Sequence, residues 1–418
     1  MRKAVFASMM MATAMTGLPL AAADEVALSM PEGFRAEVVA VDLGLVRHLT
    51  VGKGGWIYAA LARSKDGKGA VALRDSDDDG KADDIRYFAS GLRGTGMKIN
   101  DGYLYMGTRT TIVRWPLAAG VVPEGEPQVM VSGFPVQRAH AAKSMAFDGK
   151  GHVYVNVGAP SNACMEETRQ KGSPGQQPCA ELEQQGGIWR FDASKPGQDQ
   201  MRDGFRYATG LRNAVAVRWN TSADALYLTQ HGRDQLNQFF PELFDKTASA
   251  ELPAEELHRV EEGDNLGWPY SYYDQRIGSR MLMPEYGGDG KIRASDTGFK
   301  VPVAAFPGHW APNDLIFPGS AFWPEAYQGG ALIAFHGSWN RGNAQQGYKL
   351  VYVPMDKNGA VDGKWATFMD GFAGPGPIKS AGDAKYRPGG LAEGPDGALY
   401  ISSAQGGGRV WRVTYEGN

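Results

Sequence analysis

Imidazole and guanidinium groups recur in this chain at the points where short apolar runs begin or end. His140 lies in RAHAAKSMAFDGKGHVYVNVG (138–158), directly ahead of a segment with the pattern of two strands around a glycine turn. Arg212 and Asn213 precede a similar segment in GLRNAVAVRWN (210–220). A neutral imidazole can take a proton near neutral pH, since its reference pKa is about 6.5, and a guanidinium can stabilise developing negative charge. The two residue types suggest a base beside cations, provided that the fold brings them together.

A second group of residues could bind a metal ion. RDSDDDGKADD (74–84) is similar to a calcium-binding loop, in which oxygen ligands occur at alternate positions. The ligands would be Asp75, Asp77, Asp79, the carbonyl of Lys81, and Asp83. The last ligand position holds Arg86 instead of Glu, and the loop lies between two expected strands rather than two helices. An acidic hairpin turn explains the same residues, so a structural calcium site and a plain turn are both open.

The elements that would position these residues form a repeat. One pattern occurs six times, a glycine turn followed by alternating apolar residues, and this alternation indicates a strand. The copies are 54–61, 101–108, 150–158, 223–231, 329–337 and 396–404. A third strand follows each copy, at 70–77, 111–117, 187–192, 257–263, 349–356 and 409–416. A fourth strand often follows, as in 85–92 and 127–134.

Six four-stranded units predict an all-β fold, a six-bladed β-propeller. The last unit reaches the C-terminus with three strands, so FRAEVVAV (34–41) is expected to supply its outer strand and close the ring. Two separate β-domains are the alternative architecture. The extra length at about 232–312 would form insertions on one face.

The loops of one propeller face surround the central channel. The loops from an outer strand to the next inner strand contain Arg47, His48, Arg93, Arg138, His140, Arg212, Asn213, His309, Lys385 and Arg387. The loops after the second strands contain Arg63, Asn162, His231, Arg233, His336, Arg341 and Gln405. Asp234 and Asp314 are the main carboxylates. Clustered cations repel one another unless an anion lies among them, so we expect a polyanionic ligand in a basic funnel.

With these residues, the chain resembles the pyrroloquinoline-quinone-dependent glucose/sorbosone dehydrogenase family, and above all its sorbosone-dehydrogenase-like branch. The resemblance covers roughly residues 31–416. Its motifs are GLRN (210–213), HGRD (231–234), GDNLGWP (263–269), FHGSWNR (335–341) and YRPGGLAEGPDGALYISSAQGGGRVWRV (386–413). The resemblance implies a six-bladed propeller that binds calcium and pyrroloquinoline quinone, an ortho-quinone with three carboxylates.

The resemblance also implies roles for single residues. His140 matches the catalytic base of the family, and Arg212 with Asn213 matches an Arg-Asn pair against the quinone. Lys385 and Arg387 match a late cationic pair on the cofactor carboxylates.

Further positions concern the calcium and the substrate. Gly232 and Arg233 match loop residues whose main-chain carbonyls bind the cofactor calcium. Where glucose dehydrogenases have a cofactor lysine this chain has SWNR, with Arg341 as its substitute. Ala139 stands where an acid precedes the base. The substrate pocket is therefore expected to differ from that of the glucose enzymes.

The reaction implied is the oxidation of a sugar or a sugar-derived aldehyde. His140 would take the hydroxyl proton, hydride would pass to the quinone, and Arg212 with calcium would polarise the quinone oxygen. The chain has no C-x-x-C-H haem motif, so a separate acceptor, a cytochrome or a quinone, would take the electrons. The alternatives are a non-catalytic propeller that binds a carbohydrate or a partner, and a calcium-dependent lactonase. A lactonase needs Glu, Asp and Asn oxygens in the channel, and the basic funnel does not favour it.

The N-terminal segment has the pattern of a secretory signal. Arg2 and Lys3 precede an apolar run over 4–18 and three alanines at 21–23. This pattern predicts that residues 1–23 are removed, that 24–418 form the propeller domain, and that the protein is periplasmic or secreted. No later stretch is apolar and long enough to span a bilayer.

Charge and cysteine content fit an exported protein. Removing Arg2 and Lys3 changes the formal net charge from −3 to −5, which gives no reason to expect a nucleic-acid partner. The two cysteines are Cys164 and Cys179. Export permits a disulfide between them, and two free thiols are the alternative.

Overall fold

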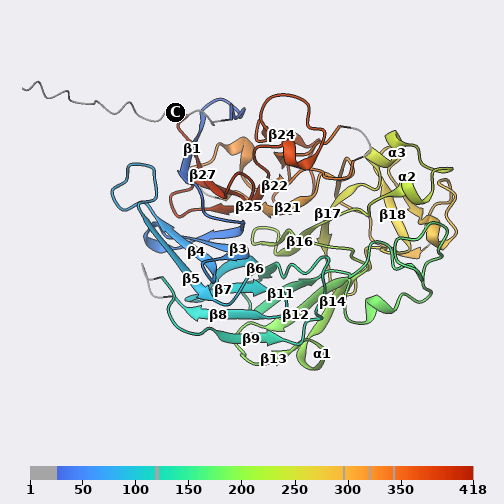
Figure 1. The fold of residues 1–418 in the computed structure, drawn as a ribbon, viewed down its shortest axis with the longest axis horizontal. Helices are drawn as coiled ribbons and strands as arrows, with labels where there is room; N and C mark the ends of the chain where they lie inside the picture. The colour runs from blue at the N-terminus through green and yellow to red at the C-terminus, as the bar shows by residue number, and fades with distance from the viewer. Residues whose placement is uncertain (1–25, 118–121, 295–296, 320–321, 342–343, 418) are drawn as a thin grey trace, which may run out of the picture.

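Six blades, each built on four antiparallel strands, form a ring, and a short fifth strand pairs parallel with the outer strand of one blade (Figure 1). The computed structural model describes residues 26–117, 122–294, 297–319, 322–341 and 344–417, so the predicted signal segment, residues 1–23, lies outside the described residues. Blade 1 consists of β2 (Val46–Val51), β3 (Ile57–Lys65), β4 (Lys68–Arg74) and β5 (Asp84–Ser90). Blade 2 consists of β6 (Gly94–Asn100), β7 (Tyr103–Thr108), β8 (Ile112–Pro116) and β9 (Gln128–Ser132). Blade 3 consists of β10 (Met145–Phe147), β11 (His152–Val157), β12 (Gly187–Asp192) and β14 (Phe205–Thr209).

Blades 4 to 6 complete the ring. Blade 4 consists of β15 (Val217–Asn220), β16 (Ala225–Gln230), β17 (Glu255–Val260) and β20 (Ala304–Phe306). Blade 5 consists of β21 (Pro312–Ile316), β22 (Ala331–Phe335), β23 (Lys349–Val353) and β24 (Ala366–Met369). Blade 6 consists of β25 (Pro388–Glu393), β26 (Leu399–Ser403), β27 (Arg409–Tyr415) and β1 (Phe34–Ala40). The first strands of successive blades contact one another all the way round, including β2 with β25. The predicted six-bladed propeller is therefore confirmed.

The ring closes through the N-terminal strand, as the sequence predicts. β1 pairs antiparallel with β27, with Phe34 opposite Tyr415. The Phe34 ring also lies 5.0 Å from the ring of Phe368 on β24, between centroids. One aromatic side chain thus ties the N-terminal strand to both blade 6 and blade 5, and β1 gives blade 6 its fourth, outer strand.

The hydrophobic core lies between neighbouring blades. Tyr105 and Met130 of blade 2, for example, pack in one cluster with Val155 and Trp189 of blade 3. All six residues of β16, ALYLTQ, are buried, because a second strand is covered on both sides. Each such apolar side chain contributes about 1.5–3 kcal/mol when fully buried. The same burial explains why the second strands carry the clearest apolar pattern in the sequence.

The insertions gather at blade 4 and at the neighbouring end of blade 3. α2 (Leu236–Phe239) and α3 (Lys246–Glu251) precede β17, and the hairpin of β18 (Ser271–Asp274) and β19 (Ser279–Leu282) follows it, so β17 and β20 lie within the stretch expected to be an insertion (Figure 1). In blade 3, β13 (Gln198–Asp199) and α1 (Gln200–Asp203) reach back to β9. Short 3-10 helices are η1 (Lys53–Gly55), η2 (Ala180–Glu183), η3 (Pro284–Tyr286), η5 (Glu325–Tyr327) and η6 (Ala381–Asp383).

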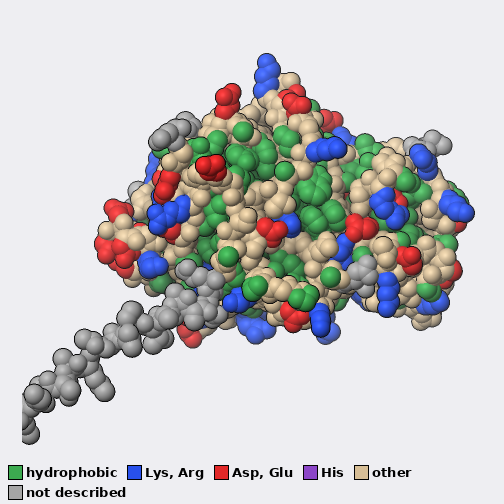
Figure 2. Space-filling view, turned by 90° about the horizontal axis from the view of Figure 1, so that it is seen from above, with side chains coloured by type: hydrophobic (Ala, Val, Ile, Leu, Met, Phe, Trp, Pro, Cys, Tyr) green, Lys and Arg blue, Asp and Glu red, His purple; other side chains and the backbone are tan. Residues whose placement is uncertain are grey.

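The outer surface carries charges of both signs. On the face shown in Figure 2, Lys and Arg side chains are interspersed with Asp and Glu, and apolar side chains lie between them. This face has no extended basic patch. No helix within the described residues is long and apolar enough to cross a membrane.

Candidate active site

A cavity of about 430 Å³ opens at one end of the channel. Residues from the loops of several blades line it: Arg47, Ala62, Gly94, Thr95, Thr108, Arg109, His140, Ala141, Ala142, Asn213, Val215, His231, Ala311, Asn313, His336, Trp339 and Arg387. Among these described residues there are three arginines and three histidines, and none is a carboxylate. Its size is typical of a small-molecule site, and its chemistry favours an anion.

The three arginines keep their charge available to a ligand. Arg387 donates from Nε and Nη2 to the carbonyls of His336 and Gly337, at 2.9 and 2.5 Å. Burial and then the charge of Arg387 lower the pKa of Arg47, but an arginine stays protonated at neutral pH. No described carboxylate forms an ion pair with Arg47, Arg109 or Arg387, unlike the arginines elsewhere in the channel. An anion in the cavity would relieve the electrostatic repulsion between Arg47 and Arg387.

His140 presents a free lone pair to the cavity. Its Nδ1 lies 2.7 Å from the carbonyl of Ala159. A carbonyl only accepts hydrogen bonds, so Nδ1 carries the hydrogen and Nε2 remains a base. Burial, and next the charge of Arg212, lower the pKa of His140 to about 3. The imidazole is therefore neutral at any pH near 7.

The backbone around His140 is tightly constrained. His140 has a left-handed φ of 51°, and Gln137 Nε2 donates to the carbonyls of Ala139, His140 and Gly158 at 2.8, 3.1 and 2.9 Å. A Cβ on Gly158 would lie 2.7 Å from His140 Cβ, so only glycine leaves room for the histidine here. The orientation of the imidazole is thus set by its own loop and by the end of β11.

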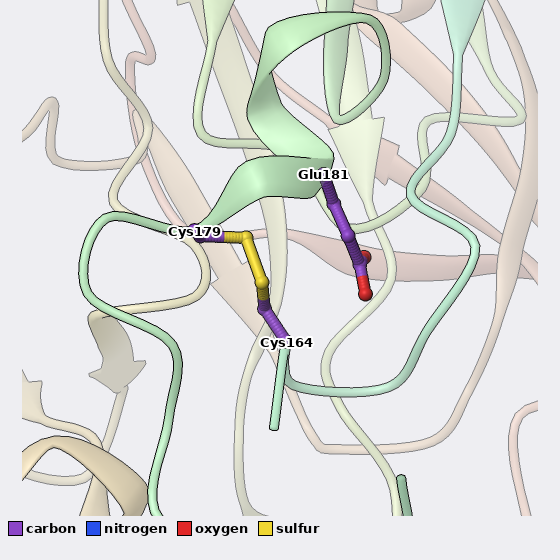
Figure 3. Close-up of side chains that lie close together, drawn as sticks. All are labelled: Cys164, Cys179 and Glu181. Carbon is purple, nitrogen blue, oxygen red and sulfur yellow. A yellow bond between two sulfur atoms is a disulfide. The ribbon is translucent and has the colours of Figure 1, made fainter. Parts of the chain in front are cut away.

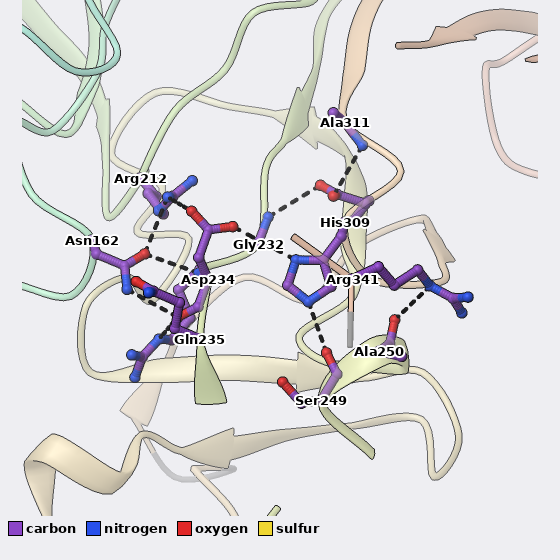
Figure 4. A network of polar contacts seen from close by, with 12 residues as sticks. Asn162, Arg212, Gly232, Asp234, Gln235, Ser249, Ala250, His309, Ala311 and Arg341 are labelled. Atoms are coloured by element: carbon purple, nitrogen blue, oxygen red, sulfur yellow. Dashed lines mark hydrogen bonds and ion pairs between the residues drawn. The ribbon is translucent and has the colours of Figure 1, made fainter. Parts of the chain in front are cut away.

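Two further imidazoles in the cavity are held in the same way. His231 Nε2 lies 2.9 Å from the carbonyl of Pro312, and His336 Nδ1 lies 3.0 Å from that of Pro388. Burial lowers the pKa of His231 to about 4 and that of His336 well below 6.5. His309 differs, because it does not line the cavity and contacts Asp234 (Figure 4). Burial alone would lower the pKa of His309, but the hydrogen bond to Asp234 and its charge raise it.

Arg212 is fixed behind the cavity by an acidic and an amide side chain (Figure 4). Its Nη2 lies 2.8 Å from Asp234 Oδ2 and 3.1 Å from Asn162 Oδ1. Burial would raise the pKa of Asp234, but the charge of Arg212 outweighs it and holds that pKa far below its usual range. Arg212 Nε and the neighbouring Asn213 Oδ1 are buried and have no hydrogen-bond partner among the described residues. A donor and an acceptor left over side by side are what a polar, planar ligand would need.

The structure separates the other predicted cofactor residues. Arg341 does not line the cavity; it forms an ion pair with Glu251 and donates from Nε to the carbonyl of Ala250 at 3.0 Å (Figure 4). Lys385 is exposed and does not line the cavity, although Arg387 does. Arg341 and Lys385 are therefore not brought together with His140.

The loop predicted to bind the cofactor calcium lies beside the cavity. The side chain of Arg233 is fully buried and paired with Glu285, so only its main chain could take part in a metal site. Gly232 N donates to Glu255 Oε2 at 3.1 Å, and burial raises the pKa of this carboxyl to about 7. Two main carboxylates, Asp234 and Asp314, were predicted from the sequence. Three more, Glu251, Glu255 and Glu285, were missed because they lie in the insertion and on β17.

The remaining predicted funnel residues fall into two groups. Arg63, Arg93 and Arg138 are exposed and outside the cavity lining. His48 is buried with its Nε2 2.7 Å from the carbonyl of Asn313. Asp314 lies near His48, and the charges of His48, Lys98 and Arg218 outweigh its burial and lower its pKa.

Sequence reasoning missed two conspicuous lining residues, Arg109 and Trp339. Arg109 Nη2 donates to the carbonyl of Gln137 at 2.6 Å, in the loop that carries His140. Arg109 directly follows the second strand of blade 2, as His231 follows that of blade 4, so the repeat register could have identified it. Trp339, 59% exposed at the cavity, lies in the FHGSWNR motif.

The aspartate loop between β4 and β5 gathers three of its predicted ligands. Carboxylate oxygens of Asp75, Asp77 and Asp83 lie within 4.8 Å of one another. Asp79 is outside this group and accepts from Lys81 N at 2.8 Å. No residue of this loop lines the cavity. A structural calcium at this loop stays a prediction.

The two cysteines form a disulfide, which confirms the predicted pairing (Figure 3). Cys164 and Cys179 lie in the long loop between β11 and β12, with Cα atoms 6.1 Å apart and Glu181 close by. They pack with Trp268 from the blade 4 insertion in one hydrophobic cluster. The disulfide thus braces the loop that carries Asn162.

Comparisons with known proteins were made for the whole chain. A family model described as TrAA12-like matches residues 28–416. An uncharacterised protein of Borreliella burgdorferi is 25% identical over 210 residues, 50% of this chain and 48% of that protein. The chain thus spans about half the length of the curated relative that it matches.

Several solved structures share the fold. The holo form of the PQQ domain of pyranose dehydrogenase from Coprinopsis cinerea has a TM-score of 0.73 at 18% identity, covering 94% of this chain and 98% of that one. The calcium structure of a Trichoderma reesei carbohydrate-active enzyme of family AA12 has a TM-score of 0.73 at 18% identity, covering 93% and 97%. The PQQ-bound form of aldose sugar dehydrogenase from Streptomyces coelicolor has a TM-score of 0.57 at 16% identity, covering 92% and 99%.

Proposed function

Because this chain belongs to the TrAA12-like family, we propose that it is an exported oxidoreductase that oxidises a sugar with pyrroloquinoline quinone and calcium. The names of the similar structures support this proposal, since they include a PQQ domain, a calcium structure and a PQQ-bound sugar dehydrogenase. The finer form of the proposal is a sorbosone- or aldose-like substrate, with a sugar-derived aldehyde as a further option. The disulfide supports an oxidising, extracytoplasmic location.

One observation carries the proposal: a neutral histidine faces a cavity whose charged lining is entirely cationic. Arg47, Arg109 and Arg387 have no carboxylate partner among the described residues, and His140 keeps Nε2 free. A tricarboxylate fits the arginines, and a hydroxyl substrate above it fits the base. A cavity for a neutral sugar alone would not need three guanidinium groups without counter-ions.

The cofactor can be assigned to residues of this chain. Arg47 and Arg387 would hold carboxylates, and Asn213, also in the lining, would face the polar edge of the ring system. Arg212 lies outside the lining; its Nε, buried without a partner among the described residues, would face the same edge. The main-chain carbonyls of Gly232 and Arg233 would hold the calcium. When bound, the quinone with its calcium supplies the acceptor for the substrate hydride.

The protein groups supply the proton chemistry and the charge. His140 Nε2 accepts the proton of the substrate hydroxyl, while its Nδ1–H stays on the carbonyl of Ala159 and fixes the ring. Arg212 places a positive charge behind the reacting groups, and Asp234 keeps that guanidinium in place. Electrons then leave to an external acceptor, a cytochrome or a quinone.

Reconstitution tests the proposal. The purified protein is titrated with pyrroloquinoline quinone, with calcium and with EDTA in parallel, and the cofactor absorbance is followed. Dye reduction is then measured with aldoses, with sorbosone and with simple aldehydes, and lactone hydrolysis is measured alongside. We expect calcium-dependent binding and substrate-dependent dye reduction. Absence of binding at micromolar cofactor would refute the proposal. Sugar binding without turnover would favour the non-catalytic propeller, and lactone hydrolysis would favour the lactonase.

A further inference from the structure

We infer that Asn162 is a positioning residue, which fixes Arg212 against Asp234 and thereby aims the Arg212 guanidinium at the cavity. The inference rests on the proposed function, in which Arg212 is the cation beside the reacting groups. Asn162 lies in the long loop after β11, and its side chain contacts both Arg212 and Asp234 (Figure 4).

The amide of Asn162 is used on both of its ends. It is 2% exposed. Its Oδ1 accepts from Arg212 Nη2 at 3.1 Å and from Asp234 N at 2.9 Å, and its Nδ2 donates to the carbonyl of Asp234 at 3.0 Å. Asn162 therefore holds the main chain of Asp234 at two points and the guanidinium of Arg212 at a third. These contacts join residues that are 72 and 50 positions apart.

This arrangement leaves the other side of Arg212 for a ligand. Nη2 makes both side-chain contacts of the guanidinium, while the buried Nε has no partner among the described residues. With Nη2 bound at two points, the plane of the group is set. Without Asn162, only Asp234 Oδ2 would hold the guanidinium. Asp234 N would lose its partner, and the Asp234 carbonyl would keep only the Nε–H of Arg233. Arg212 could then turn its unpaired N–H groups toward Asp234 and away from the cavity.

Asn162 is itself anchored from outside the blade. Its carbonyl accepts from Trp268 Nε1 at 3.1 Å, and Cys164, in the disulfide, follows two residues later. The hydroxyl of Tyr286 donates to the carbonyl of Cys164 at 3.1 Å. Because the insertion and the disulfide both hold this loop, Asn162 cannot follow Arg212 if the arginine moves. The loop acts as a fixed frame for the guanidinium.

The residue type fits this role, and residues of similar size without an amide do not. An aspartate has no N–H group for the Asp234 carbonyl and would add a second negative charge beside Asp234. A leucine of similar size offers neither donor nor acceptor and would leave buried polar groups unpaired. Asn162→Ala and Asn162→Ser, whose hydroxyl is too short to reach Arg212, are therefore the informative variants; the serine variant serves if the alanine variant does not fold.

The first measurement is independent of the cofactor. A crystal structure of Asn162→Ala without ligand should show the Arg212 guanidinium turned, with N–H groups that are unpaired in the parent now directed toward Asp234 and away from the cavity. A guanidinium in its parental position would overturn the inference. If the parent protein binds no pyrroloquinoline quinone, the proposed function fails, but this structure still decides the role of Asn162.

The second measurement is a double-mutant cycle with Arg212→Ala. Cofactor affinity and turnover per bound cofactor are measured for the parent, Asn162→Ala, Arg212→Ala and the double variant. We expect Asn162→Ala alone to cost about 10–100-fold, the usual effect of losing a partner that orients a functional group. In the Arg212→Ala background the same change should cost less than about 3-fold, since a positioning residue acts through its target.

A matched control separates positioning from general stability. Asn220 is also buried, at 3%, and accepts from Ser222 N and Ala223 N at 3.0 and 3.1 Å in the turn between β15 and β16. Asn220→Ala should lower the melting temperature without changing turnover per bound cofactor. The inference would be contradicted if Asn220→Ala and Asn162→Ala caused equal losses of turnover. It would also be contradicted if the effects of Asn162→Ala and Arg212→Ala were independent in the cycle.

Discussion

At the residue scale, the histidines of the site are neutral, and its positive charge comes from arginines. His140, His231 and His336 each direct one ring nitrogen to a main-chain carbonyl, which can only accept. The hydrogen therefore stays on that nitrogen, and the opposite nitrogen is a lone-pair base. Burial then disfavours the imidazolium. The positive charge that an anion needs comes instead from the arginines.

His140→Ala should lower turnover per bound cofactor by about 10²–10⁴-fold, the usual contribution of a general base. Cofactor affinity should survive, because Arg47, Arg109 and Arg387 are untouched. Steady-state dye reduction, normalised to bound cofactor, measures the loss, and a thermal melt controls for folding. Turnover within 10-fold of the parent would remove His140 from the role and leave His231 and His336 as candidates, because His309 does not line the cavity.

Arg387→Ala and Lys385→Ala should differ in their effect on cofactor affinity, although the sequence groups the two residues as one pair. Arg387 lines the cavity and Lys385 does not. A hydrogen bond to a charged group is worth about 1.5–3 kcal/mol, or roughly 10–100-fold, so Arg387→Ala should weaken cofactor binding by that factor. Lys385→Ala should change it by less than about 3-fold. Spectroscopic titration with pyrroloquinoline quinone distinguishes the two, and equal losses would restore Lys385 to the site.

At the scale of elements, loops at the ends of rigid strands carry the functional side chains, and other loops brace them. The β11–β12 loop is the clearest case. It holds Asn162, its disulfide closes it, and the blade 4 insertion packs on it through Trp268. Chain segments that lie far apart in sequence thus build one wall of the site.

Replacing both cysteines, as Cys164→Ser with Cys179→Ser, should lower the free energy of unfolding by about 3 kcal/mol. The disulfide closes a loop with a sequence separation of 15, and a loop of this size gains about that much from restricted unfolded-state entropy. Urea unfolding of the double variant, compared with the parent before and after reduction, measures the effect. An unchanged midpoint would mean that packing alone holds the loop.

At the scale of the whole molecule, a slightly acidic protein encloses a basic cavity. The net charge is −3, yet the charged residues that line the cavity are arginines. The propeller makes this possible, because its outer strands face solvent while the ends of its inner strands converge. Charge on the outer surface and charge in the channel are therefore independent of each other.

Stability should fall as the pH is lowered from about 6.5 to 4. An unfolded histidine has a pKa of about 6.5, whereas burial lowers that of His140 to about 3 and that of His336 well below 6.5. In this window the unfolded chain binds more protons, so the free energy of unfolding decreases by up to about 1.4 kcal/mol per pH unit for each such group. His309 acts in the opposite sense, because its pKa is raised.

Urea unfolding at pH 8 and pH 5 measures this dependence. His336→Gln should reduce the loss between the two pH values, because glutamine does not titrate. An identical loss in parent and variant would show that His336 is protonated in the folded protein.

The fold was predictable from the sequence because each blade repeats the same local pattern. Six short turns with apolar strands define the blades, and the three-stranded last copy implies that Phe34–Ala40 closes the ring. The insertion was placed only approximately, because β17 and β20 are short and lie within it.

The site was only partly predictable, because a loop position does not fix the direction of a side chain. The sequence determined the propeller, the pairing partner of Cys164, and the convergence of His140, Asn213 and Arg387 on one face, since strand order and register decide these features. The tertiary structure alone decided that Arg341 turns to Glu251 while Arg109 enters the cavity. Whether a buried cation faces a ligand or a carboxylate depends on neighbours from distant segments, here the blade 4 insertion. The local sequence around the cation does not show which of the two it will face.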